Sequence, residues 1–199
     1  MDAKAIKKQN SIKTMILVVV MALLVLGYFF IINNRVKPRE ETNTKVSPVK
    51  ELLIMNLDSN YPATPKEVVR LYLEITRCFY GEEYSDEELE ELAKMSRKLF
   101  DDELIANQSE DNYFRALRGE IATYKQYNRV ISSYSTSAAA DVQYYDFQGD
   151  KWAQLVAMLS VRTGTNIEPS KERFLLRKDE SGHWKIYGWV LEELNNKEE

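Results

Sequence analysis

The hydrophobic pattern begins with one long run of uncharged, mostly apolar residues, TMILVVVMALLVLGYFFII, from Thr14 to Ile32. As a helix, these residues at about 1.5 Å each would reach roughly 28 Å, which is close to the hydrocarbon thickness of a bilayer. The alternative is a cleaved signal peptide, which needs a shorter apolar core and a small-residue cleavage site, and this stretch has neither. The run therefore predicts a single uncleaved transmembrane helix over residues 14–32.

The segments on either side of this run predict its orientation and a linker. Residues 1–13 carry four lysines against Asp2 and form a basic tail, which favours a cytoplasmic N-terminus and places residues 33–199 outside the cytoplasm. Residues 33–60 form the expected linker, because their first part is polar and holds two prolines. The apolar stretch at 51–57 is expected to pack onto the following domain as a short lead-in.

Helical spacing dominates the pattern from residue 61 to about residue 127. Thr64 and Glu67 form a capping-box sequence around Pro65, and apolar residues then recur on one face as far as Gly81, a typical helix-ending residue. A second capping box starts at Ser85. The pattern predicts three helices, over about 64–80, 85–99 and 110–127, with a short helical turn at 101–105.

The pattern changes after Asn128 to runs rich in β-branched and aromatic residues, which are typical of strands. Turn sequences at 147–150 and 179–182 divide these runs into hairpins. In WAQLVAMLSVR, which starts at Trp152, both alternating sets are largely apolar, so we expect a central strand covered on both faces. Helices followed by an antiparallel meander predict the α+β class, with three helices on one face of a curved sheet of four to five strands.

Charge and cysteine content exclude several kinds of function. The formal net charge is −4, but residues 61–199 alone carry 18 basic and 26 acidic side chains. A domain this acidic is a poor candidate for binding nucleic acid, because that affinity depends on neutralising phosphates. With one cysteine and one histidine in the chain, neither an internal disulfide nor a Cys/His metal site can form. We therefore expect no cofactor and no nucleic-acid partner.

The order of elements over residues 61–194, ending in WKIYGWVLEEL, resembles the NTF2-like (SnoaL-like, cystatin-like) fold. That fold is a cone in which a bent sheet wraps around the first helix, and residues 195–199 would be a polar tail after it. The segments YPATPKEVVRLY, YSDEELEELA, LFDDELIANQ, ISSYS and FLLRKDESGHWKI, behind an N-terminal span, resemble an uncharacterised family of single-pass membrane proteins from Gram-positive bacteria. This resemblance implies a fold and a topology but no activity and no catalytic residue.

Aromatic side chains expected at the inside or the rim of the cone are the candidates for a binding site. They are Tyr72, Phe79, Tyr124, Trp152 and Trp189. Such a lining can hold an apolar ligand or a peptide. The competing interpretation is that these residues are ordinary core, which is the commoner role of aromatics at helix and strand spacing.

Other residues with reactive side chains fit structural roles better than chemical ones. His183 lies beside a predicted turn, and Asp141 and Asp146 flank the second strand, where solvated carboxylates are usual, although Asp146 could point inward. Cys78 follows the apolar face of the first helix and is expected to be a buried thiol. The acidic run over 82–91 lacks the spacing of a calcium-binding loop, and the chain has no P-loop or G-x-S-x-G sequence.

Three hypotheses for function follow from these features. The first is a non-catalytic binding or interaction domain, tethered to the cell membrane through residues 14–32, which meets envelope proteins outside the cytoplasm. The second is a small-molecule binder or enzyme that uses the cone, which predicts a deep pocket with at least one inward carboxylate. The third is an assembly subunit of a secretion or conjugation complex, since the bitopic assembly proteins of those machines share this layout of tail, span, linker and cone.

Overall fold

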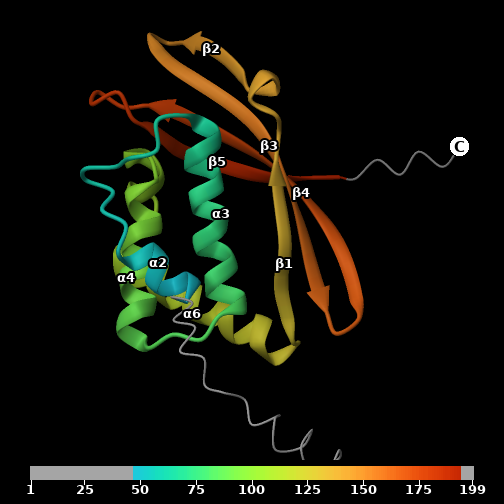
Figure 1. Cartoon of the computed structure of the whole chain (residues 1–199). Coiled ribbons are helices and arrows are strands. Elements are labelled where there is room, and N and C mark those ends of the chain that lie inside the picture. The colour runs from blue at the N-terminus through green and yellow to red at the C-terminus, as the bar shows by residue number, and fades with distance from the viewer. Residues whose placement is uncertain (1–46, 194–199) are drawn as a thin grey trace, which may run out of the picture. The chain divides into compact units, whose positions relative to one another are not determined.

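The computed structural model describes residues 47–193, in which helices come first and strands follow (Figure 1). The helices are α2 (Pro48–Leu53), α3 (Pro65–Gly81), α4 (Asp86–Lys98), α5 (Asp102–Ala106) and α6 (Glu110–Gln126). The strands are β1 (Arg129–Thr136), β2 (Gln143–Phe147), β3 (Asp150–Thr163), β4 (Asn166–Lys178) and β5 (Trp184–Glu192), with a 3-10 turn, η1 (Ala139–Asp141), before β2. This order confirms the predicted α+β class.

The capping sequences start the helices where the pattern placed them. The hydroxyl of Thr64 accepts a hydrogen bond from the Glu67 amide at 3.2 Å, and the Glu67 carboxylate accepts one from the Thr64 amide at 3.1 Å. Ser85 and Glu88 form the same reciprocal pair at the start of α4. The predicted turn at 101–105 is the short helix α5, capped by Asp101. These local bonds satisfy amide groups that have no partner within the helix.

All five strands form one antiparallel sheet in the order β1-β3-β4-β5, with β2 pairing the other end of β3 beyond β1. At the turn between β2 and β3, Gln148 and Gly149 have positive φ angles of 54° and 92°, as the predicted tight hairpin requires. The strand β3 is central, as expected from its apolar sequence. The sheet therefore has β5 as an edge strand next to β4, and Ile186 on its outer side exchanges backbone hydrogen bonds with Leu99 and Asp101, at 2.8 Å and 2.9 Å.

The expectation that β3 is covered on both faces is wrong. The described helices all lie on one face of the sheet (Figure 1), where Leu155 and Leu159 of β3 are buried. The alternate residues Val156 and Met158 face the other way and are only half-buried. The reason is that no second layer of helices covers that face within residues 47–193, so an apolar sequence on both sides of a strand did not imply burial on both sides.

The helix α3 is the centre of the packing. It contacts the sheet through β1, β3 and β5 and also contacts α2, α4 and α6. Because neighbours surround it, buried residues such as Val69, Leu73 and Tyr80 lie outside the single apolar face that the spacing predicted. Phe174 and Leu176 of β4 are fully buried on the helix-facing side of the sheet. The hydrophobic core thus lies between α3 and the sheet.

The folded unit begins earlier than the predicted boundary at residue 61. The helix α2 lies inside the segment assigned to the linker, and Val49, Leu52 and Leu57 are buried against the domain, which confirms the expected packing of the apolar stretch at 51–57. The apolar residues at 49 and 52 are three apart, so one side of a short helix can face the core. The described residues, 47–193, form one compact unit with its own core, which is what a domain needs to fold by itself.

The predicted membrane span at 14–32 lies outside the described residues, as do the polar part of the linker up to residue 46 and the tail from residue 194. Among the residues that the structure describes, no helix combines the length and the apolar character needed to cross a bilayer. The span therefore stays a prediction from the sequence.

Candidate functional site

Three of the five predicted aromatic residues line one cavity between the helices and the sheet. Tyr72 comes from α3, Tyr124 from α6 and Trp189 from β5. The cavity has a volume of about 340 Å³. Its remaining wall consists of Leu73, Thr76, Tyr80, Glu120, Ile131, Leu159, Val161, Ser170, Glu172 and Leu191. A space of this size, with aromatic walls and a few polar groups, has the character of a small-molecule site.

The other two predicted residues lie elsewhere. Phe79 is 2% exposed and belongs to the hydrophobic core, where its carbonyl accepts a hydrogen bond from the Tyr84 hydroxyl at 2.6 Å. Trp152, near the tip of the β2–β3 hairpin, packs edge-on against Tyr187 at 5.0 Å between ring centres. Neither side chain reaches the cavity wall. Their aromatic character therefore serves packing.

A bulge in β5 turns Trp189 toward the cavity. Leu175 of β4 pairs with Gly188, but the next residue, Leu176, pairs with Ile186, so Tyr187 is an extra residue in β5. An extra residue reverses the alternation of side chains along a strand. Trp189 consequently shares the helix-facing side with its partner Phe174, and its ring lies 5.2 Å from that of Tyr72. Without the bulge, Trp189 would face away from the helices.

Two carboxylates also belong to the cavity wall, and neither is among the residues that the sequence predicted for the site. Glu172 lies two residues before Phe174 on β4 and so shares its helix-facing side. Glu120 of α6 lies three residues after the buried Leu117 and four before Tyr124. Both positions continue an apolar stripe, at strand and helix spacing respectively, and this spacing was the signal that could have identified them.

The two carboxylates influence each other and the tyrosines around them. Burial, followed by the charge of Glu120, raises the pKa of Glu172 above its usual value. Burial also raises the pKa of Tyr80, and the charge of Glu120 and a hydrogen bond to it raise it further. The ring of Tyr80 stacks on that of Tyr124 with 3.9 Å between centres. The site thus combines stacked phenol rings with a pair of like charges.

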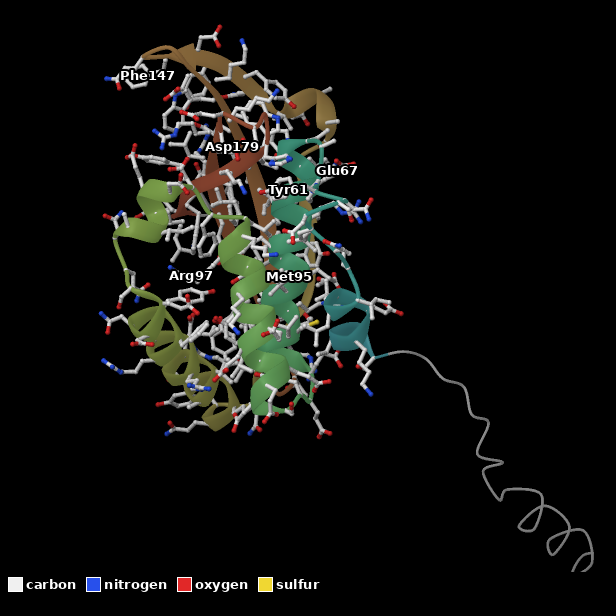
Figure 2. The ribbon with its side chains drawn as sticks, turned by 90° about the vertical axis from the view of Figure 1, so that its left-hand side faces the viewer. Tyr61, Glu67, Met95, Arg97, Phe147 and Asp179 are labelled. Atoms are coloured by element: carbon white, nitrogen blue, oxygen red, sulfur yellow. The ribbon has the colours of Figure 1, made fainter. Side chains whose placement is uncertain are left out.

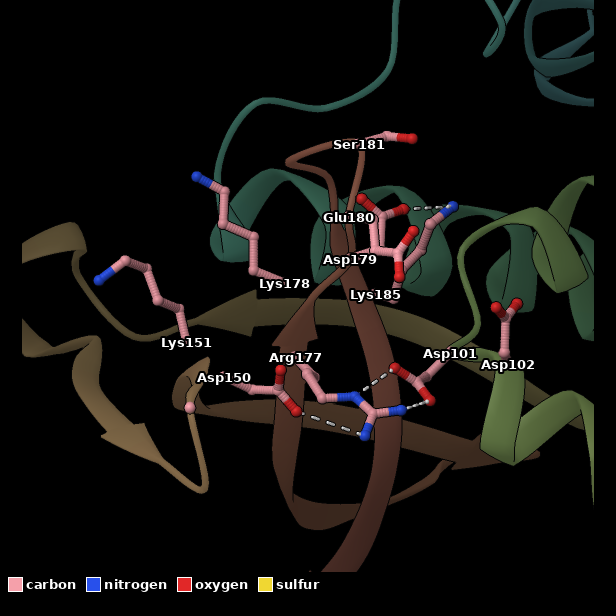
Figure 3. Close-up of a pocket in the computed structure, with 11 residues that line it drawn as sticks. Asp101, Asp102, Asp150, Lys151, Arg177, Lys178, Asp179, Glu180, Ser181 and Lys185 are labelled. Atoms are coloured by element: carbon pink, nitrogen blue, oxygen red, sulfur yellow. Dashed lines mark hydrogen bonds and ion pairs between the residues drawn. The ribbon is translucent and has the colours of Figure 1, made fainter.

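A larger, charged groove lies at the end of the sheet near the β4–β5 turn (Figure 3). It measures about 650 Å³, and Arg177 stands at its centre. The guanidinium binds the buried Asp101 through two hydrogen bonds, of 3.0 Å and 2.6 Å, and also binds Glu103 at 2.7 Å. These bonds raise the pKa of Arg177 well above its usual value, with the bond to Asp101 contributing most. The positive charge of Arg177 is therefore balanced by carboxylates of the protein, and its hydrogen bonds tie α5 to the sheet.

The remaining candidates do not come together into a reactive set. His183 donates its backbone N–H to Asp179 at 2.7 Å, and its ring packs at a tilt against that of Tyr61, which Figure 2 shows near Asp179. Asp146 is exposed and pairs with Lys151 at 3.2 Å. Asp141 is exposed at the end of η1. These residues play the surface roles that the sequence favoured.

The cysteine and the acidic run are likewise accounted for. Cys78 is fully buried, and this burial raises the pKa of its thiol to about 11. Within the acidic run, Glu91 pairs with Lys94 at 2.9 Å and Glu90 with Arg118 at 3.0 Å. Among residues 47–193, no three histidine, cysteine or carboxylate side chains gather as metal ligands.

The fold and the cavity define an α+β domain with a single antiparallel sheet and an aromatic, acidic pocket under its helices. A family model described as "Domain of unknown function (DUF6715)" matches residues 1–189, and the chain therefore belongs to that family. The match includes the apolar run at 14–32 as well as the helices and nearly all of the sheet. No protein with a curated description matches the chain.

Proposed function

We propose that this protein is a membrane-tethered domain with an NTF2-like cone that binds a small molecule outside the cytoplasm without transforming it. The observation that carries this proposal is the cavity of about 340 Å³ lined by Tyr72, Tyr124 and Trp189. Its aromatic walls supply contact area, and its carboxylates supply orientation, which is the usual division of work in a ligand pocket. The second of the three hypotheses drawn from the sequence expected such a pocket with an inward carboxylate.

The arrangement of the sheet and α3 supports the NTF2-like assignment. A five-stranded antiparallel sheet follows the helices in the chain, and the first long helix packs across one of its faces. Bulges in β1, between Ile131 and Ser133, and in β5 interrupt the ladders, and bulges bend a sheet around what it covers. The cavity then lies where the mouth of a cone would be.

The composition of the cavity favours binding over catalysis. Its wall, as drawn from the described residues, contains no histidine, lysine or cysteine. Nucleophilic catalysis needs a nucleophile within hydrogen-bond reach of a base, and the tyrosines here have pKa values raised by burial, which makes them weaker nucleophiles at neutral pH. Glu172 is the kind of group that acts as a base, but among the described residues no hydrogen bond joins it to a nucleophile.

The predicted span at 14–32 and the linker give the domain its place in the cell. A domain held on such a tether meets ligands and proteins of the same membrane at a high effective concentration, so modest affinity is sufficient. Labelling of intact cells with a membrane-impermeant amine reagent tests this part. We expect labelling of the domain's lysines without lysis; labelling that requires lysis would place the domain in the cytoplasm.

Ligand copurification tests the pocket itself. The full chain is purified from its native membrane in a mild detergent, and retained small molecules are identified by mass spectrometry. Ser170→Phe would place a ring inside the cavity, whereas Ser135→Phe adds the same ring at an exposed position of β1. We expect a molecule retained by the wild type and by Ser135→Phe but lost from Ser170→Phe. Equal retention by all three, or retention by none, would refute the pocket as a binding site.

A second candidate function is the interaction with envelope proteins, and the surface of β2 favours it. Tyr144, Tyr145 and Phe147 are 56%, 42% and 54% exposed, although they are large apolar residues on one short edge strand. An assembly subunit of an envelope complex is the narrower form of this candidate. Crosslinking in intact cells would distinguish it, since a specific partner captured through β2, and lost after Tyr144→Ser, would support protein binding.

A further inference from the structure

The cavity wall carries negative charge that no positively charged side chain of the wall balances. Glu120 and Glu172 both line it, and no lysine or arginine belongs to its wall as the described residues define it. Glu172 is half-buried and loses part of its hydration, and the exposed Glu120 at the rim repels it. Such an arrangement costs stability in the empty protein and is relieved by a positive charge between them.

The basic residues beside Glu172 in the sequence do not supply that charge. Lys171 and Arg173 alternate with it along β4, so their side chains leave the strand on the other face. Both pair with Glu192 of β5, Lys171 at 2.9 Å. Glu192 therefore binds the two cations next to Glu172, and the carboxylate of Glu172 is left without them.

The basic residues on the helix side of the cavity also have contacts elsewhere. Arg118, two residues before Glu120 on α6, pairs with Glu90 of α4 at 3.0 Å. The guanidinium of Arg129, at the start of β1, lies over the ring of Tyr127 at 5.5 Å and lines no part of the cavity. The cations near both carboxylates thus have partners of their own outside the cavity.

The aromatic residues of the wall add a second attraction for positive charge. The faces of Tyr and Trp rings carry negative potential, which attracts ammonium groups, most strongly where water is excluded. Tyr80 and Tyr124 stack at 3.9 Å, and Tyr72 and Trp189 lie 5.2 Å apart, so two pairs of rings border the same space. The leucine, isoleucine and valine residues on the sheet side complete an apolar surface.

Resting on the proposed function, we propose that the cavity takes a cationic small molecule, namely an ammonium group carried on an apolar or aromatic body. The ammonium lies between Glu120 and Glu172, and the apolar body packs against Tyr72, Trp189 and the sheet. An anionic ligand would face two like charges, and a neutral ligand would leave both carboxylates without a cation. The raised pKa of Glu172 agrees with this assignment, because a bound cation would stabilise the ionised form of its carboxylate.

Three probes of matched shape and different charge test the proposal: 2-phenylethylammonium, 2-phenylethanol and 3-phenylpropanoate. Each is titrated at neutral pH into the full chain in a mild detergent, with the same detergent alone as the blank. Calorimetry measures the affinity, and tryptophan fluorescence reports on Trp189. We expect the ammonium probe to bind about tenfold or more tightly than the alcohol, and the carboxylate probe to bind least.

Three variants with the same change of charge locate the effect. Glu120→Gln and Glu172→Gln each remove one carboxylate of the cavity, whereas Glu168→Gln removes an exposed one from the same strand, β4, outside the cavity. We expect the ammonium probe to lose about tenfold in affinity with each cavity variant and to be unaffected by Glu168→Gln. The affinity of the alcohol should stay the same in all three.

The outcomes separate this inference from the proposed function. Equal affinity for the ammonium and the alcohol, or equal losses in all three glutamine variants, would overturn the preference for cations. If none of the probes binds while the wild type still retains a small molecule on purification, the cation proposal fails and the pocket stands as a ligand site. If none binds and nothing is retained, both fail.

Discussion

Replacing Asp101 by alanine tests whether the charged groove of Figure 3 is structural. The carboxylate of Asp101 is 3% exposed and accepts two hydrogen bonds from Arg177, at 3.0 Å and 2.6 Å. It also caps α5 by accepting the amide of Glu103 at 3.0 Å. One side chain therefore joins the start of α5 to the end of the interior strand β4, and its removal affects both.

The expected loss follows from these contacts. Breaking a buried ion pair costs about 3–5 kcal/mol, because the remaining charge is left without its partner. Arg177 keeps its bond to Glu103 at 2.7 Å, and its side chain is 20% exposed, so water and a second carboxylate reduce the penalty. The lost cap accounts for about 1 kcal/mol. We therefore expect Asp101→Ala to lower the free energy of unfolding by about 3 kcal/mol, at the lower end of the range.

Urea unfolding of the fragment 46–199, followed by circular dichroism, measures this loss. The matched control is Glu103→Ala, which removes another carboxylate from the same arginine at an exposed position, where solvent screens the interaction. We expect its effect to be small. A loss below about 1 kcal/mol for Asp101→Ala would show that the Asp101–Arg177 pair does not hold the groove together, because breaking a buried ion pair costs more than that. Arg177 would then be free to bind an anion, and the groove would become a ligand site.

Three further predictions concern the cavity and the core. Burial and Glu120 raise the folded-state pKa of Glu172, so this group's contribution is greatest below the unfolded value of about 4.3 and is lost as pH rises through the folded value. Glu172→Gln should therefore stabilise the protein in urea unfolding at neutral pH, with a gain that disappears in acid; a loss at neutral pH would contradict this. Cys78, with a pKa of about 11, should react with a thiol reagent far more slowly in the folded protein than in urea, and equal rates would show that it is accessible. Phe174→Ala should lower the free energy of unfolding by about 3–5 kcal/mol, while the exposed Val190→Ala should change it by about 0.5 kcal/mol or less; similar losses would place Phe174 outside the core.

The helices could be predicted closely because their signals are local. The bonds that begin α3 join Thr64 to Glu67, and those that begin α4 join Ser85 to Glu88, each three residues apart. Such short-range chemistry is readable without knowing the rest of the fold. The tight turn at Gln148 and Gly149 was predictable for the same reason, since its backbone angles depend on the two residues themselves.

The candidate site could be predicted only in part. Tyr72 and Tyr124 were found because helical spacing places them beside buried residues, and Trp189 because it belongs to the final strand. Phe79 was assigned to the same wall, but its position among the neighbours of α3 buries it in the core. Glu120 and Glu172 were passed over, since a charged residue within an apolar stripe is ordinarily solvated.

The sequence by itself determined the α+β fold class, the starts of the helices, the hairpin turns and the central position of β3, because each depends on residues close together in the chain. It also predicts the span at 14–32, on its length and apolar character alone. Only the tertiary structure decided that the short lead-in before the domain begins as the helix α2 at Pro48, that one face of β3 stays half-exposed and that Trp189 meets Tyr72. These depend on the register between β4 and β5 and on which surfaces the helices cover, and long-range packing sets both.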